Sequence, residues 1–304
     1  MKNKKKAIII GFGSIGKRHY KILKKLNYFD EIFVFSNQKV LIKNKITKLE
    51  AIKKINPDYF VICSDTSKHY FQLKYIINNF SKKKILVEKP LYEKVYDLKI
   101  KNDNKVYVAY NFRFHPIIKK VKSLCSNKNI FFIKVFCGSY LPSWRPNRDY
   151  KKIYSSDIKR GGGVLLDLSH EIDYINWIFG KINTYHKIYK KISYLKTTSK
   201  DYLNISGYIK RNTHLELGLN YFSKFPKRDI LIEGKNISIF ADLIKNQLQI
   251  INKDKFKIYN FPKNSLDQSY ELEHRDILFK GAKKVCSYIE ALEILKFSKN
   301  ISKP

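Results

Sequence analysis

Residues 6–26, KAIIIGFGSIGKRHYKILKKL, decide the fold class of this chain. The apolar run Lys6–Ile10 predicts a buried strand that stops at glycine, and apolar residues from Ile15 to Leu26 recur at the spacing of a helix. Glu31–Phe35 again has the pattern of a strand, so the whole stretch predicts a βαβ unit.

The turn between this strand and helix is Gly11-Phe12-Gly13-Ser14-Ile15-Gly16, which has the GxGxxG spacing of a dinucleotide-binding loop. Gly11 permits the tight turn, Gly13 lets a pyrophosphate approach the backbone, and Gly16 lets the helix pack closely on the strand. The helix amino terminus, which begins with Ser14 and Ile15, then faces the phosphates. We therefore predict that these residues bind a dinucleotide cofactor.

Strand-like and helix-like segments continue to alternate up to about residue 110, which predicts a parallel sheet with helices on both faces. The expected helices are 48–55, 69–80 and 93–101, and the expected strands are Tyr59–Cys63, Lys84–Val87 and Lys105–Tyr110. We place a domain boundary near residue 118, with a Rossmann dinucleotide-binding domain at 1–118 and a substrate-binding and oligomerisation domain at 119–304.

The second domain has long strand-like runs with few helices between them, which predicts an antiparallel sheet. The expected strands are Ile130–Cys137, Tyr202–Lys210, Thr213–Phe222, Asp229–Ile232, Asn236–Phe240 and Gln247–Ile251, and the expected helices are Gly163–Phe179 and Glu273–Lys299.

The formal net charge of +35 raises the alternative of a nucleic-acid-binding protein. Only eight of the 61 basic residues are arginine, and lysines recur along the whole chain beside Asn, Ile, Tyr and Phe. Arginine suits forked phosphate contacts better than lysine does, so this composition favours a solvated coat and no nucleic-acid partner.

The remaining compositional signals concern metals and membranes. No cysteine or histidine spacing typical of a metal site is present, so we expect no metal. The apolar run Ala7–Ile10 is too short for a secretion signal, and no stretch approaches the length of a membrane span. We therefore expect a cytoplasmic protein with no membrane partner.

The end of the second predicted strand bears on the choice of cofactor. NAD-selective sites carry an acidic residue about 20 residues beyond the glycines, where it binds the ribose 2′-hydroxyl. Here that place is taken by Ser36-Asn37-Gln38-Lys39, which has no carboxylate to repel a 2′-phosphate. Ser36, Asn37 and Lys39 can instead bind that phosphate, so we expect NADP in preference to NAD.

Further motifs carry a resemblance to a known family. Ser64-Asp65-Thr66-Ser67-Lys68-His69 follows a predicted strand, Val87-Glu88-Lys89-Pro90 contains an EKP motif, and Gly161-Gly162-Gly163 leads to Asp167 and His170. With the glycine loop, these motifs resemble the Gfo/Idh/MocA family of oxidoreductases over nearly the whole chain.

The resemblance implies an α/β fold in which an N-terminal Rossmann dinucleotide-binding domain joins a C-terminal α/β domain with an open, mostly antiparallel sheet. It also implies that Ser64, Asp65, His69, Glu88 and Lys89 lie beside the cofactor. Family members pair through the open face of that sheet, so a homodimer or homotetramer is expected.

The candidate catalytic residues are Lys89, Asp167 and His170. Lys89 follows a predicted strand, at the edge where open α/β sheets bind ligands, and burial beside a cofactor lowers the pKa of an amine. Asp167 and His170 are three residues apart on a predicted helix, so both project from one face and the acid can orient the imidazole. In the resembled family this pair is usually four apart.

Arg113, Trp144, Arg145 and Tyr150 are expected, with Asp167 and His170, to line the substrate side. Arginines there grip carboxylate or phosphate, and aromatic rings stack on a sugar or base. The alternative is that these four residues are ordinary loop and core positions.

These observations predict an NAD(P)-dependent dehydrogenase or reductase. It transfers a hydride between the nicotinamide and a carbinol or carbonyl carbon of a sugar, sugar acid or nucleotide sugar, and surface-polysaccharide biosynthesis is a further hypothesis. The alternative is a sensor or scaffold of the same fold that binds the cofactor and has lost turnover.

Overall fold

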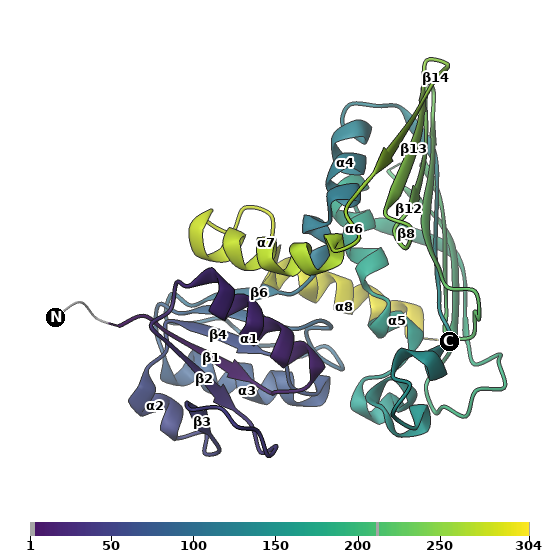
Figure 1. The fold of residues 1–304 in the computed structure, drawn as a ribbon. Coiled ribbons are helices and arrows are strands. Elements are labelled where there is room, and N and C mark those ends of the chain that lie inside the picture. Colours follow the sequence, from purple (N-terminus) through teal and green to yellow (C-terminus); the bar gives the residue numbers. More distant parts are fainter. Residues whose placement is uncertain (1–3, 211–212, 304) are drawn as a thin grey trace. The chain divides into compact units, whose positions relative to one another are not determined.

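The computed structural model describes residues 4–210 and 213–303, which belong to two compact units (Figure 1). The first unit contains the chain up to Tyr110 together with Tyr270–Lys296, and the second contains Asn111–Ser269 and the residues from Phe297 onward. The chain therefore leaves the first unit and later returns to it, which the single boundary expected near residue 118 does not describe.

The first unit holds a seven-stranded sheet with the order β15-β6-β5-β4-β1-β2-β3. Its strands are β1 (Lys6–Ile10), β2 (Glu31–Phe35), β3 (Lys45–Ile46), β4 (Tyr59–Ile62), β5 (Lys84–Val87), β6 (Lys105–Val108) and β15 (Cys286–Ser287). All neighbours are parallel except β15, which runs antiparallel to β6. Strands β1 and β4 are almost wholly apolar because a parallel sheet is covered on both faces.

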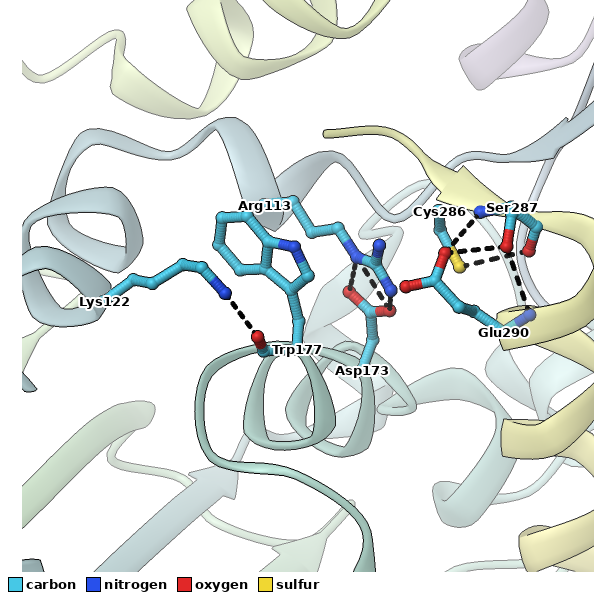
Figure 2. Close-up of polar contacts among 7 residues, drawn as sticks. All are labelled: Arg113, Lys122, Asp173, Trp177, Cys286, Ser287 and Glu290. Carbon is cyan, nitrogen blue, oxygen red and sulfur yellow. Dashed lines mark hydrogen bonds and ion pairs between the residues drawn. The ribbon is translucent and has the colours of Figure 1, made fainter. Parts of the chain in front are cut away.

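Helices α1 (Ser14–Leu26), α2 (Ala51–Ile55) and α3 (Thr66–Asn79) alternate with these strands, and parts of α7 (Ser265–Phe279) and α8 (Tyr288–Ser302) complete the unit. A reciprocal cap starts α8. The Ser287 backbone N–H donates to Glu290 Oε2 at 2.8 Å, and the Glu290 backbone N–H donates to Ser287 Oγ at 3.3 Å (Figure 2).

Two helices that the sequence predicts in the first unit are not formed as expected. Residues 93–101 form no helix. Tyr96 stacks on Tyr70 of α3 at 3.9 Å between ring centroids, and the Leu98 carbonyl accepts a hydrogen bond from Tyr288, so packing holds this segment in an irregular course. The expected helix 273–299 is likewise interrupted, because the chain turns at Gly281 with φ +71° and pairs β15 with β6.

The second unit holds an eight-stranded sheet with the order β14-β13-β12-β11-β7-β10-β9-β8. Its strands are β7 (Ile130–Gly138), β8 (Ile182–Lys190), β9 (Tyr202–Ile209), β10 (Thr213–Asn220), β11 (Lys227–Gly234), β12 (Ile237–Asp242), β13 (Gln247–Asn252) and β14 (Lys255–Asn260). Every pair is antiparallel except β7 with β10, so the mostly antiparallel sheet and the α/β fold class are confirmed.

Helices α4 (Pro116–Cys125), α5 (Val164–Asp167) and α6 (His170–Phe179) belong to the second unit, and Figure 1 shows α4 and α6 on one face of its sheet. Alternate residues Leu215, Leu217 and Leu219 of β10 are buried on that face. Arg228 of β11 also holds α6, because its Nε donates to the buried Glu171 carboxylate at 2.8 Å. Short 3₁₀ turns cover much of 141–160.

Candidate functional site

The glycine loop of the first unit has the geometry that a dinucleotide needs. Gly11 has φ +97°, and a Cβ on it would lie 2.6 Å from the Ser64 backbone nitrogen. A Cβ on Gly16 would lie 2.3 Å from the Gly11 carbonyl oxygen, so α1 packs closely on the loop. Gly11 and Gly16 are therefore required by the protein's own packing.

Gly13 differs from the other two glycines. Its φ of −70° suits any residue, and a Cβ on it would meet no atom within 4 Å beyond its two neighbours in the chain. The absence of a side chain leaves open space at the amino end of α1, where backbone N–H groups and the helix dipole favour a phosphate. The loop therefore fits the pyrophosphate of a dinucleotide.

The segment Ser36–Lys39 follows β2, the strand paired with β1. Ser36 is buried and its Oγ accepts a hydrogen bond from the Gln38 backbone N–H at 3.2 Å, whereas Asn37 is exposed. Neither position supplies a carboxylate. The segment is consequently compatible with either a 2′-hydroxyl or a 2′-phosphate.

Ser64 and Asp65 lie between β4 and α3, and His69 belongs to the first turns of α3. His69 is buried, with Nε2 3.1 Å from the Ser64 carbonyl oxygen and Nδ1 3.2 Å from that of Pro90. Burial lowers the pKa of His69. His69 therefore joins the turn after β4 to the chain after β5.

Glu88 and Lys89 directly follow β5, at the carboxyl end where open parallel sheets bind ligands. Glu88 is buried and Lys89 is half-buried. Glu88 Oε2 accepts a hydrogen bond from the Lys89 backbone N–H at 3.2 Å, and Oε1 lies 2.8 Å from His19 Nε2. The structure thus brings Glu88 together with His19, a partner for which the sequence gives no spacing signal.

Asp167 and His170 lie in the second unit, and the helix expected to carry both is broken between them. Helix α5 ends at Asp167 and α6 begins at His170. Ser169 Oγ donates to the Leu166 carbonyl at 2.8 Å, a local bond of the kind that competes with helical hydrogen bonding. The expectation that both side chains project from one helical face is therefore wrong.

Asp167 instead has tyrosine neighbours. The Tyr221 hydroxyl donates to Asp167 Oδ2 at 2.5 Å. Burial and the nearby Asp167 carboxylate raise the pKa of both Tyr221 and Tyr154 well above the usual value, so both phenols keep their hydrogens. Sequence reasoning missed these two residues, because Tyr221 follows β10 and no local pattern links it to Asp167.

His170 packs against an aromatic ring. Its ring centroid lies 4.7 Å from that of Phe112, and the guanidinium of Arg228 lies 4.6 Å from the same Phe112 ring. His170 retains slight solvent exposure.

Arg113 is held by an acidic partner, as Figure 2 shows. Its Nε donates to Asp173 Oδ2 at 3.0 Å and a terminal nitrogen donates to Oδ1 at 2.7 Å, with both side chains buried. Such a paired guanidinium is occupied, and its face lies 5.7 Å from the Trp177 ring. The geometry favours a structural role for Arg113 over direct substrate binding.

Two of the other expected substrate residues, Trp144 and Arg145, adjoin the tyrosines around Asp167. Trp144 meets Tyr221 edge to face at 5.3 Å, and its Nε1 donates to Ser139 Oγ. The Arg145 guanidinium lies 5.9 Å from the ring of Tyr154, so both residues adjoin the tyrosines around Asp167. Tyr150 is engaged elsewhere, because its hydroxyl accepts a hydrogen bond from the Lys196 backbone N–H at 3.1 Å.

Comparison with known proteins adds to this geometry. No family model matches the sequence. Two curated relatives from Bacillus subtilis strain 168 are named as oxidoreductases: YrbE is 27% identical over 193 residues, and YteT is 24% identical over 149 residues. These matches span 57% and 43% of this chain, but only 53% of YrbE and 32% of YteT.

Solved structures match almost the whole chain. UDP-N-acetylglucosamine 3-dehydrogenase GnnA from Acidithiobacillus ferrooxidans has a TM-score of 0.77 at 15% identity and covers 97% of this chain and 95% of its own. An Agrobacterium radiobacter oxidoreductase in complex with NAD⁺, L-tartaric acid and magnesium has a TM-score of 0.82 at 18% identity, with 98% and 95% covered. The chain shares their fold.

A third similar structure is a super-repressor mutant of Gal80p from Saccharomyces cerevisiae, with a TM-score of 0.82 at 14% identity and with 98% of this chain and 95% of that chain covered. The fold is therefore common to dehydrogenases and to a protein named as a repressor. Function must accordingly be argued from the residues of the site.

Residues 4–210 and 213–303 bring no three His, Cys, Asp or Glu side chains together as a metal site would require. Within the same residues, no helix combines the length and the apolar character needed to cross a bilayer.

Proposed function

We propose that this protein is an NAD(P)-dependent oxidoreductase of the Gfo/Idh/MocA family that acts on a sugar-type substrate. The open space at Gly13, beside two glycines that the fold itself requires, is the observation that carries the proposal. The EKP motif after β5 and the shared fold of the dehydrogenase structures support it.

The nicotinamide, when bound, accepts or supplies the hydride. Lys89 is proposed to take the proton of the substrate hydroxyl during oxidation and to return it to the carbonyl oxygen during reduction. Its place at the carboxyl end of β5 and its partial burial suit that task. His170 is proposed as the second proton-transfer group.

Asp167 is proposed to act through the tyrosines rather than through His170. Its carboxylate accepts the Tyr221 hydroxyl hydrogen and thereby holds that ring against Trp144. Aromatic faces and hydroxyl groups together suit a pyranose, whose ring carbons stack on aromatic rings and whose hydroxyls need hydrogen-bond partners. The proposed substrate contacts are Trp144, Arg145, and the two tyrosines beside Asp167, Tyr154 and Tyr221. Tyr150 lies in the segment 141–160 that also carries Trp144 and Arg145.

The substrate class and the cofactor form are finer parts of this proposal. A nucleotide-linked sugar is favoured by Arg145, which offers a guanidinium to phosphate, and by the similarity to GnnA, named as acting on a UDP-sugar. Such a substrate fits surface-polysaccharide biosynthesis. The lack of a carboxylate at Ser36 and Asn37 favours NADP, with NAD as the alternative.

Association of two or more copies is proposed through the outer face of the second unit's sheet. Leu231, Phe240 and Ile258 share this face, because Leu231 pairs with Phe240 and both Phe240 and Ile258 pair with Gln249. Phe240 is 38% exposed and Ile258 is 48% exposed. A second copy of the chain would cover these apolar side chains.

The decisive experiment has two parts. NADPH and NADH are titrated against the protein by cofactor fluorescence, and hydride transfer to or from a panel of sugars, sugar acids and nucleotide sugars is then followed by cofactor absorbance. We expect binding and turnover with at least one member. Binding without any turnover would favour the alternative that the similarity to Gal80p raises, a cofactor-binding sensor.

A further inference from the structure

Four buried polar side chains form one hydrogen-bonded line through the first unit. Tyr59 of β4 lies 2.9 Å from His274 Nδ1 of α7, measured from its hydroxyl oxygen. His274 Nε2 lies 2.8 Å from His19 Nδ1 of α1, and His19 Nε2 lies 2.8 Å from Glu88 Oε1. The two histidines are 0% exposed, Tyr59 is 1% exposed and Glu88 is 8% exposed.

The direction of these hydrogen bonds follows from the end of the line at Tyr59. Burial, with help from the charge of Glu273, raises the pKa of Tyr59 well above its usual value, so the hydroxyl keeps its hydrogen. A buried hydroxyl needs an acceptor, and Nδ1 of His274 lies at hydrogen-bonding distance. Tyr59 therefore donates to His274.

The positions of the hydrogens on His274 and His19 follow from this first hydrogen bond. Burial and the neighbouring His19 hold the pKa of His274 well below its usual value, so this ring is neutral and carries one hydrogen. Because its Nδ1 accepts from Tyr59, the hydrogen sits on Nε2 and is donated to His19 Nδ1. His19 then carries its own hydrogen on Nε2 and donates it to Glu88.

All three hydrogen bonds consequently point toward one carboxylate, and such aligned bonds polarise one another. Glu88 Oε1 receives the last of them, while Oε2 accepts the backbone N–H of Lys89. A buried carboxylate is costly unless its oxygens are paired, so this arrangement holds Glu88 in one orientation. The backbone that carries Lys89 is held with it.

We propose that Tyr59, His274 and His19 are positioning residues, a hydrogen-bonded relay that orients Glu88 and through it the proposed acid–base residue Lys89. Both imidazoles are Nε2–H tautomers in this relay. The effect of this relay on turnover rests on the acid–base function proposed above for Lys89. The tautomers of His19 and His274 do not depend on that function.

The tautomers are tested in the resting protein by ¹⁵N NMR of histidine-labelled samples near pH 7. His19→Gln and His274→Gln assign the two rings, and His186→Asn, at an exposed position in the second unit, is the control. We expect both rings to be neutral with hydrogen on Nε2. A hydrogen on His274 Nδ1, or a doubly protonated His19, would overturn the relay whether or not a substrate is known.

The positioning role is tested by two matched replacements of His19. Glutamine carries its amide about where the imidazole has Nε2, so His19→Gln retains a donor to Glu88 and loses the link to His274. Asparagine carries its amide about where the ring has Nδ1, so His19→Asn does the reverse. We expect His19→Asn to lower kcat about tenfold to a hundredfold more than His19→Gln, at similar thermal stability.

Equal losses in the two variants, in proportion to their loss of thermal stability, would show that His19 only stabilises the fold and would contradict the positioning role. Absence of hydride transfer in the wild-type protein would instead contradict the function proposed for Lys89, with the NMR result standing on its own. The two failures are thus distinguishable.

Discussion

The carbonyl oxygen of Gly11 lies 2.3 Å from the place that a Cβ on Gly16 would occupy, whereas a Cβ on Gly13 would meet no atom within 4 Å beyond its two neighbours in the chain. The glycine loop therefore contains two glycines required for folding, Gly11 and Gly16, and one, Gly13, whose missing side chain leaves room for a ligand. Substitutions at Gly16 and Gly13 can therefore test folding and cofactor binding separately.

We expect Gly13→Val to fold normally and to lose most NADPH binding, because its side chain would occupy the open space at the start of α1. Gly16→Ala should unfold at a lower temperature, since its methyl group would collide with the Gly11 backbone. Thermal unfolding and cofactor fluorescence measure the two effects. Normal NADPH binding by Gly13→Val would contradict the loop assignment.

The cofactor preference is expected to follow the charge after β2. Wild-type protein should bind NADPH more tightly than NADH, and Asn37→Asp should weaken NADPH binding roughly tenfold or more by repelling the 2′-phosphate. Asn37 is exposed, so the change should leave the fold intact. Equal affinity of the wild-type protein for both cofactors would remove the preference.

Lys89→Met keeps a long apolar stem and removes the exchangeable proton. We expect turnover to fall by about two to four orders of magnitude, the usual contribution of general acid–base catalysis, with little change in thermal stability. Turnover is measured with whichever substrate the panel identifies. If most activity survives, the acid–base role belongs to another group such as His170.

The break between α5 and α6 separates the roles of Asp167 and His170. His170→Asn should lower turnover and shift its pH profile, because it removes a proton-transfer group. Asp167→Asn should act more mildly and mainly raise KM, as should Tyr221→Phe, because the two residues share one hydrogen bond. Additive effects in the Asp167→Asn, Tyr221→Phe double variant would contradict this coupling.

Stability is expected to fall in acid partly through His115. Burial, with the Arg228 charge, lowers the pKa of His115 to about 4, whereas an unfolded histidine titrates near 6.5. Between about pH 6.5 and pH 4, His115 is protonated in the unfolded chain and remains neutral in the folded protein. The free energy of unfolding should therefore decrease from about pH 6.5 to about pH 4, by about 3 kcal/mol from this residue.

His115→Asn isolates that contribution. His115 is the N-cap of α4, and its Nδ1 accepts the Ile117 backbone N–H at 3.3 Å. Asparagine is a good N-cap and does not titrate, so this variant should show a shallower loss of stability between pH 7 and pH 4.5 in urea unfolding. An unchanged slope would mean that other groups dominate, among them His69 and His274, whose pKa values are also lowered.

Oligomerisation is expected to depend on the outer face of the second unit's sheet. Phe240→Lys places a charge among Leu231 and Ile258 on that face. We expect sedimentation to show a dimer or tetramer for the wild-type protein and a smaller species for the variant. A wild-type protein that stays monomeric at high concentration would refute the proposed association.

The sequence predicted best what local pattern determines. The glycine loop, the limits of β5 and the change from parallel to antiparallel strands all arise from residues close together in the chain. The break between Asp167 and His170 was not predicted, because hydrophobic periodicity contains no information about the hydrogen bond from the Ser169 side chain to the backbone. The helix expected at 93–101 does not form either, because Tyr96 of this segment stacks on Tyr70 of α3.

Long-range partners could not be predicted in this way. The carboxylate of Asp167 is paired with Tyr221 from a distant strand end, and Glu88 with His19 from another helix. Each pair forms only after separate helices and strands have packed together, so no spacing in the sequence predicts it. The sequence therefore located the motifs of the candidate site but not these long-range partners, and the roles of the site residues stay predictions.

The return of residues 270–296 to the first unit has a consequence for synthesis on the ribosome. The emerging polypeptide presents the glycine loop early, yet His274 and the edge strand β15 are translated only after the whole second sheet. Until then His19 has no partner at Nδ1, and β6 keeps an uncovered edge. The first unit, although it is started first, is thus completed only after the whole second sheet has been translated. A nascent chain halted at residue 269 would expose the edge of β6 to wrong pairing.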